Sequence, residues 1–283
     1  MQKRYNNYRN PAKYIFALML VLLLACEKKF KWTYEEVIEG IPVVESIITN
    51  ENTNQIVKLS LVRTDPNSEN IPLSGANVSV TLGALVFQFT ESAQFPGMYI
   101  SNDAFSGVPG MEVKLKVEVL DKTYEASDRM QAVSAGNQAL FLPSSHDTTL
   151  FYLVRSGSIL YTTEPAMWEF NISWDFLPNY AHLSAEQCKA RIFYYDLKVL
   201  DQGQIFAPQQ DEQYFPEGAQ VIQTKYSLSD KHKEFRRSLL LETEWRGGFM
   251  DVSPGTVYTN LNNGAMGFFG ASAVVRDTFN IAR

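Results

Sequence analysis

Apolar and polar side chains alternate along much of the chain after about residue 40. Val57, Leu59 and Leu61 alternate with lysine and serine, and the segment from Val113 to Val119 has an apolar side chain at every second position. Successive side chains of a strand point to opposite faces of a sheet, so a period of two predicts strands with one face in a core and the other in water. Antiparallel sheets are built from such strands. The pattern therefore predicts a mainly β protein.

Short segments of the same type fill residues 40–130. We predict strands at Ile41 to Thr49, Val78 to Leu82, Leu85 to Thr90 and Met98 to Ser101. Turn-forming residues separate them, at Pro72, Gly75, Gly83, Pro96-Gly97 and Pro109-Gly110. About seven short strands in a segment of this length are typical of a β-sandwich, so residues 40–130 are predicted to form one.

One part of this segment resembles a known class of sandwich. Pro72 to Val80, followed by Phe87 to Thr90 and Gly97 to Tyr99, is similar to the prealbumin-like or carboxypeptidase-regulatory domain. In that class a Gly-Ala turn leads into a strand, and a Gly-x-Tyr strand follows. The resemblance implies an N-terminal prealbumin-like or Ig-like β-sandwich that serves as a binding or spacer module rather than as a catalyst.

The alternation is looser after Met130, and residues 131–283 are predicted to form a second β-rich part. Its predicted strands are Phe151 to Val154, Trp168 to Trp174, Ala190 to Leu200 and a final one from Gly267 to Arg276. The polar segment from Asp201 to Gly218 is predicted to be a loop.

One main helix is predicted at Ser229 to Trp245. Ser229 or Asp230 can accept a hydrogen bond from a free N–H group of the first turn. Phe235, Leu239 and Trp245 return at near-helical spacing, and Gly247-Gly248 can end the helix in a left-handed turn.

The N-terminal residues have the pattern of an export signal. Four basic residues precede an apolar stretch from Ile15 to Ala25, which is too short to cross a bilayer as a stable helix and stops at Cys26. The run from Leu23 to Cys26 resembles the lipobox of bacterial lipoproteins, in which the cysteine is lipidated and the chain is cleaved before it. We therefore predict a lipoprotein signal peptide at 1–25, lipidation of Cys26 and a tether at 26–39. An ordinary secretory peptide and an uncleaved anchor are the alternatives.

The net charge of the chain restricts the kinds of partner that it can bind. The whole chain has 25 Lys and Arg against 31 Asp and Glu. The signal contains four of the basic residues and no acidic one, so the mature chain has 21 against 31 and a net charge of −10. Such a surface repels phosphate backbones, so we predict no nucleic-acid binding. Contact with the membrane is predicted through the N-terminal lipid rather than through basic side chains.

Residues of catalytic or metal chemistry are sparse. Cys188 is the one thiol left after lipidation of Cys26, so no intramolecular disulfide is expected, and burial is favoured over reactivity. His146, His182 and His232 share no metal-ligand spacing, and no catalytic motif occurs. We predict no enzyme activity, no catalytic residue, no metal site and no cofactor.

The predicted helix has a cluster of basic residues on an otherwise acidic chain. His232, Arg236 and Arg237 belong to this cluster, together with two lysines. A solvated basic face is the favoured interpretation of His232. Contact of Arg236 and Arg237 with an acidic partner surface is a further hypothesis.

Three other features can be interpreted either as purely structural or as functional. Asp65 to Asn70 is favoured as a turn over a weak Ca²⁺ loop, because its spacing fits no EF-hand. Gly264 to Gly270 lacks the lysine of a phosphate loop, and a tight β-turn is favoured. The aromatic side chains that could stack on sugar rings are favoured as core: Trp168, Trp174, Tyr194 and Tyr195.

Several motifs follow one another in a characteristic order along the chain: Cys26, Val43 to Asn50, Val57 to Leu61, Pro72 to Val80, Phe95 to Tyr99, Val108 to Gly110, Lys122 to Ala126 and Asn262 to Ala271. This order resembles a Bacteroidetes lipoprotein family known as domain of unknown function 4249, often encoded beside SusC-like TonB-dependent receptors. The resemblance implies an outer-membrane lipoprotein. Members on the cell surface usually have an acidic cluster after the cysteine, whereas this chain has Glu27-Lys28-Lys29. We predict the cell surface, and the periplasmic leaflet is the alternative.

Three classes of function compete. An accessory subunit of an outer-membrane β-barrel complex, in its simplest form a SusC-like TonB-dependent importer, is favoured by the resemblance. An assembly or secretion machine is a related alternative; a free-standing glycan-binding lipoprotein is the second class and an enzyme the third. The partner surface is predicted around Asp201 to Gly218, with Arg236 and Arg237. Asp147-Thr148-Thr149 resembles an O-glycosylation acceptor of this phylum, which makes Thr148 a candidate modification site.

Overall fold

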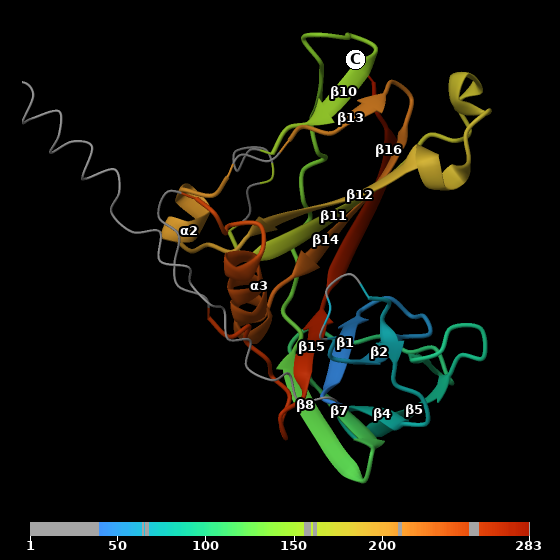
Figure 1. Ribbon diagram of the computed structural model, residues 1–283, viewed down its shortest axis with the longest axis vertical. Coiled ribbons are helices and arrows are strands. Elements are labelled where there is room, and N and C mark those ends of the chain that lie inside the picture. Colours follow the sequence, from blue (N-terminus) through green and yellow to red (C-terminus); the bar gives the residue numbers. More distant parts are fainter. Residues whose placement is uncertain are drawn as a thin grey trace, which may run out of the picture. The chain divides into compact units, whose positions relative to one another are not determined.

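Two larger β-sheets, one small sheet and two α-helices make up the part of the chain that the computed structural model describes (Figure 1). That part comprises residues 40–63, 65, 68–155, 160, 163–208, 211–248 and 255–282. The predicted mainly β composition is confirmed. The predicted signal peptide, the lipidation of Cys26 and the tether lie outside the described residues.

The first sheet has nine strands, in the order β15-β1-β2-β6-β5-β4-β7-β8, with β3 paired to β2. Their bounds are β1 Pro42–Thr49, β2 Ile56–Leu61, β3 Ile71–Pro72, β4 Asn77–Leu82, β5 Leu85–Glu91, β6 Met98–Ser101, β7 Glu112–Val119, β8 Lys122–Arg129 and β15 Met266–Ser272. β15 also lies beside β8, so the two ends of the sheet approach each other around one core. The sandwich-like architecture predicted for this segment is therefore present.

Alternation decides which side of each strand is buried. On β7, Val113, Leu115 and Val117 are buried, whereas the lysines between them are exposed. β7 pairs with β4 and β8, and its apolar side chains pack against those of β4, such as Val78 and Val80. A shift of one residue would move this apolar row into water, so the register is strongly specified.

The second sheet has four antiparallel strands, in the order β12-β11-β14-β16. They are β11 Ala166–Ser173, β12 Lys189–Asp196, β14 Gln220–Ser227 and β16 Val274–Asn280. The small sheet has the order β13-β10-β9, from β9 Phe141–Pro143, β10 Leu150–Leu153 and β13 Tyr214–Pro216. One buried cluster joins these two sheets and includes Trp168, Phe170 and Phe215.

The helices are α2 Gln202–Ile205 and α3 Asp230–Glu242, and two short 3₁₀ turns cover Pro178–Tyr180 and Ala185–Cys188. The predicted main helix is confirmed as α3. The Oγ atom of Ser229 caps its N-terminus by accepting a hydrogen bond from the backbone N–H of His232 at 3.0 Å. α3 ends three residues before Trp245, and Gly247 follows in a left-handed conformation with φ +86°.

Two sequence predictions differ from the structure in the C-terminal half. The predicted single strand from Gly267 to Arg276 is two strands, because the chain leaves the first sheet at Ala273 and enters the second. Ala273 bonds to Ser227 through both its N–H and its carbonyl. The predicted loop from Asp201 to Gly218 contains α2 and β13. β13 pairs with the distant strand β10, and Arg237 of α3 binds Asp201, which caps α2.

The C-terminal strand β15 joins the early and late parts of the chain. It pairs in parallel with β1, from Val43 opposite Met266 to Thr49 opposite Ser272 (Figure 1). Residues 38–283 accordingly group into one compact unit. The predicted domain boundary at residue 130 stays a prediction, and the first sheet takes a strand from beyond it.

Candidate functional site

His232 on α3 is buried rather than solvated, so the sequence interpretation of this residue was wrong. Its ring is fully covered and stacks on Phe268 of β15, with 4.9 Å between the ring centres. Burial, and then the charge of Arg236, lower the pKa of His232 well below 6.5, which makes the imidazole neutral. Its Nε2 atom accepts from Nε of Arg236 at 3.2 Å. The sequence showed a helix with basic residues but not that β15 covers this side of it.

Arg237 connects the two helices. It binds Oδ2 of Asp201 through Nε at 2.7 Å and through Nη2 at 2.6 Å. Oδ1 of the same carboxylate accepts from the backbone N–H of Gly203 at 2.9 Å and so caps the N-terminus of α2. Asp201 raises the pKa of the Arg237 guanidinium against the opposing effect of burial, which is the larger single influence. Arg237 therefore positions α2, and its contact with a partner stays a prediction.

Three exposed apolar side chains lie at α2, and we call Leu200, Ile205 and Phe206 the apolar tip. Leu200 is 97% exposed, and the other two are also exposed. A Cβ atom at Gly248 would lie 1.9 Å from the carbonyl oxygen of Phe206, so the turn after α3 packs closely against this segment. The apolar tip lies within or directly beside the segment Asp201 to Gly218, where the sequence placed the partner surface.

A hollow of about 530 Å³ lies between α3 and the outward side of β1 and β2. Arg191 of β12, Arg236 of α3 and Lys58 of β2 contribute positive charge to its lining, and Glu45 and Glu51 contribute negative charge. Apolar lining comes from Ile47, Ile56, Phe235, Leu239 and Phe268, and polar lining includes Thr49, Thr53 and Asn54. Sequence reasoning selected only Arg236 from this set, because the other residues come from segments far apart in the chain.

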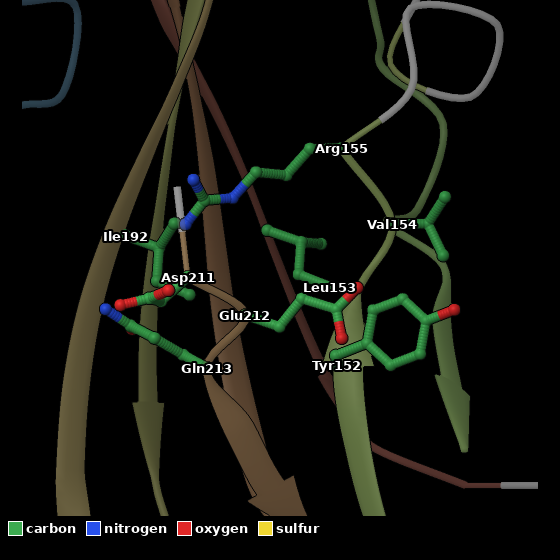
Figure 2. Close-up of a pocket in the computed structure, with 8 residues that line it drawn as sticks. All are labelled: Tyr152, Leu153, Val154, Arg155, Ile192, Asp211, Glu212 and Gln213. Atoms are coloured by element: carbon green, nitrogen blue, oxygen red, sulfur yellow. The ribbon is translucent and has the colours of Figure 1, made fainter. Parts of the chain in front are cut away.

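A second hollow, of about 440 Å³, lies between β10, β12 and the segment before β13 (Figure 2). Figure 2 shows the side chain of Arg155 extending across it toward Asp211 and Ile192. Glu212 lines the same hollow, and its Oε2 atom accepts from the Tyr214 hydroxyl at 2.6 Å. The remaining lining residues are Tyr152, Leu153, Val154 and Gln213. The sequence did not indicate this hollow.

The other candidate residues lie apart from both hollows. Cys188 is buried as predicted, and burial, followed by Asp175, raises the pKa of its thiol. Thr148 is exposed in the turn between β9 and β10, where Oδ1 of Asp147 accepts from the N–H and the hydroxyl of Thr149. O-glycosylation of Thr148 stays a prediction.

The aromatic residues were correctly interpreted as core. Trp168 is buried, and Trp174 and Tyr194 pack against the same cluster. Tyr195 packs beside α3 in another cluster. A sugar-binding platform built from these four residues would require exposed ring faces, which Trp168 does not have.

Two further properties of the described part of the chain are its capacity to bind a metal ion and its capacity to cross a membrane. His146 and His182 are exposed, and no group of three or more His, Cys, Asp or Glu side chains in the described ranges is arranged to hold a metal ion. Asp65 to Asn70 is described only in part. None of the helices in the described part of the chain has the length and apolar composition that crossing a bilayer requires.

The sequence missed a buried cation beneath the second sheet. Lys225 of β14 is 1% exposed, and its Nζ atom bonds to the carbonyl and hydroxyl of Ser134 and to Glu164 at 3.0 Å. Its charge also lies 5.7 Å from the centre of the Trp168 ring. The alternating pattern of β14 gives no signal for this contact, because its partners precede β11.

Comparison with known proteins identifies one family. The family described as "Domain of unknown function (DUF4249)" matches residues 27–278. No curated protein matches the chain. A solved structure of the chicken CNTN1 FN1–FN3 domains is similar at 8% sequence identity with a TM-score of 0.18, covering 69% of this chain and 61% of that one.

Proposed function

We propose that this chain, which belongs to the family described as Domain of unknown function (DUF4249), is a non-catalytic outer-membrane lipoprotein. It is anchored by lipid on Cys26 and faces the cell surface. It acts as the accessory subunit of an outer-membrane β-barrel complex, in the simplest case a SusC-like TonB-dependent importer. The lipobox-like run that ends at Cys26 supports lipidation of this residue. Stable anchoring requires more than one acyl chain, and bacterial lipoproteins carry several.

The apolar tip is the observation that carries the partner role. Leu200, Ile205 and Phe206 are all exposed within one short segment, on a chain of net charge −6. Exposed apolar clusters with a polar rim are typical of protein interfaces, whereas single exposed apolar residues are ordinary. The Arg237–Asp201 contact holds this tip in place, so less conformational entropy is lost when a partner binds.

The arrangement of acidic groups favours a non-catalytic role. Burial raises the pKa of the Asp128 carboxyl. Its oxygens accept from the backbone N–H groups of Arg129 and Ala271, so it joins β8 to β15. A general acid needs a raised pKa and access to a substrate, and Asp128 is buried away from both hollows.

A pull-down from gently solubilised outer membrane tests the proposal. The tagged wild-type chain should recover a β-barrel protein in stoichiometric amount. Leu200→Asp should reduce that recovery by at least about tenfold, because it places a charge in the desolvated centre of an interface. Leu85→Asp is the matched control, since Leu85 of β5 is 63% exposed and distant in sequence from the tip.

The identity of the recovered barrel separates the alternatives. A TonB-dependent receptor supports the importer, and an assembly or secretion barrel supports the related machine. A lone monomer in mild detergent, or equal recovery with Leu200→Asp and wild type, would contradict the proposed partner surface. Folding of each variant is checked by its unfolding midpoint.

A further inference from the structure

The hollow beside α3 has an excess of positive charge after the ion pairs that its lining residues form with residues outside it are assigned. Arg191 pairs with Glu169 at 2.7 Å, and Glu51 pairs with Arg276 at 2.9 Å. The charged lining residues that remain are Lys58, Arg236 and Glu45. The hollow therefore has a net charge of about +1 on a chain of net charge −6, and its field attracts an anion.

Arg236 is oriented but incompletely bonded. Its Nε atom donates to the neutral His232, whose remaining ring nitrogen, Nδ1, lies 3.4 Å from the Ser272 hydroxyl. The guanidinium carbon lies 5.4 Å from the centre of the Phe235 ring. A guanidinium has five N–H donors, and no carboxylate of the described residues forms an ion pair with this one. The Nη groups thus retain donors in a fixed plane, which is the arrangement that binds a carboxylate through two hydrogen bonds.

The rest of the lining indicates what accompanies the carboxylate. Phe235 stacks on Phe268 with 4.8 Å between ring centres, and these rings lie beside Leu239 and the exposed Ile56. Such a wall favours an apolar group next to the anion.

Three polar side chains line the same hollow, namely Thr49, Thr53 and Asn54. Their hydroxyl and amide groups can exchange hydrogen bonds with a peptide backbone. A hydrocarbon chain would desolvate them without replacement, which is unfavourable. The volume of about 530 Å³ suits a segment of a few residues.

We propose that this hollow binds the free carboxyl end of a peptide whose last side chain is apolar. Arg236 holds the carboxylate, and the wall of Phe235, Phe268 and Leu239 takes the side chain. The site does not depend on the proposed role at a β-barrel, because it lies on β1, β2 and α3 and contains no residue of the apolar tip.

Calorimetric titration of the purified chain tests this with two probes that differ only in charge. N-acetyl-Gly-Ala-Leu with a free carboxyl should bind at least about tenfold more tightly than the same peptide with a terminal amide, because a charge-assisted pair is replaced by a neutral contact. Arg236→Gln should remove this preference. Lys233→Gln is the matched control, since Lys233 lies on the same helix, pairs with Asp230 and does not line the hollow.

Each outcome decides the inference. Equal binding of the two peptides, no binding of either at millimolar concentration, or an unchanged preference in Arg236→Gln would overturn it. If octanoate bound as tightly as the free-acid peptide, the peptide source would be overturned although the arginine contact held. If Arg236→Gln failed to fold, methyl chemical shifts of Ile56 and Leu239 in the wild type would replace it: a shift caused by the acid and not by the amide is expected, and no shift would refute the site.

Discussion

Lys225 and Glu164 form an ion pair whose two members differ in exposure, and this difference makes a quantitative prediction. The Lys225 side chain is 1% exposed, whereas the Glu164 side chain is 27% exposed. Within the described ranges Lys225 forms an ion pair with no other carboxylate, and its remaining hydrogen bonds go to Ser134. Glu164 also accepts from the hydroxyls of Ser134 and Thr163. The free energy of unfolding should therefore fall by different amounts when Lys225 and when Glu164 is replaced.

Glu164→Gln leaves a buried ammonium without its counter-charge. Loss of one partner of a fully buried pair costs about 3–5 kcal/mol. Water reaches Glu164, so we expect about 2–3 kcal/mol here. Lys225→Met keeps all but the last atom of the buried side chain in length and leaves a carboxylate that water and two hydroxyls still solvate. We therefore expect a loss of about 1 kcal/mol or less. The predicted difference between the variants is about 1–2 kcal/mol.

The same pair predicts a pH dependence. Burial alone would raise the pKa of Glu164, but hydrogen bonds from Ser134, Thr163 and Lys225 lower it well below its ordinary value of 4.5. A group with a depressed pKa in the folded state contributes stability that is complete above the unfolded pKa and is lost as the pH falls through the folded pKa. The stability difference between wild type and Glu164→Gln should therefore be constant above about pH 5 and shrink below pH 4.5.

Urea unfolding followed by tryptophan fluorescence measures both effects, since Trp168 lies beside Lys225. The dependence of the unfolding free energy on urea should stay the same in both variants, which shows that only stability changes. A Lys225→Met variant that lost as much stability as Glu164→Gln would refute the reasoning. A difference that persisted unchanged at low pH would refute the assignment of the depressed pKa.

Two further predictions concern other parts of the chain. Gly267→Ala should destabilise the pairing of β15 with β1 by several kcal/mol, because Gly267 has φ +88° and an added Cβ would lie 2.1 Å from the Val44 carbonyl oxygen. Hydrogen exchange of the β1 amides measures the loss, and unchanged protection of these amides would contradict the prediction. Cys26→Ser should release the protein from the membrane fraction or leave its signal unprocessed, as seen by fractionation and mass; a membrane-bound variant of mature mass would rule out lipidation.

Features with a local cause could be predicted from the sequence. The period of two on β7 predicted which side chains are buried, because alternation is a property of any strand in a sheet with one wet face. Ser229 and Asp230 were the two candidate caps at the start of α3, and Ser229 is the cap, because a capping side chain bonds within its own first turn. Burial of Cys188 followed from its lack of a reactive context.

Features that depend on which distant segment packs against a residue were decided only by the tertiary structure. His232 and Arg236 belong to one basic run of the sequence, but β15 covers one and leaves the other at a hollow. The sequence predicted Asp201 to be a loop residue, whereas in the structure it forms an ion pair with Arg237 of α3. The pattern of a strand specifies its buried face but not its neighbour, since many strands offer an equivalent edge. The pairing of β15 with β1, the hollow beside them and the apolar tip therefore arise from long-range packing.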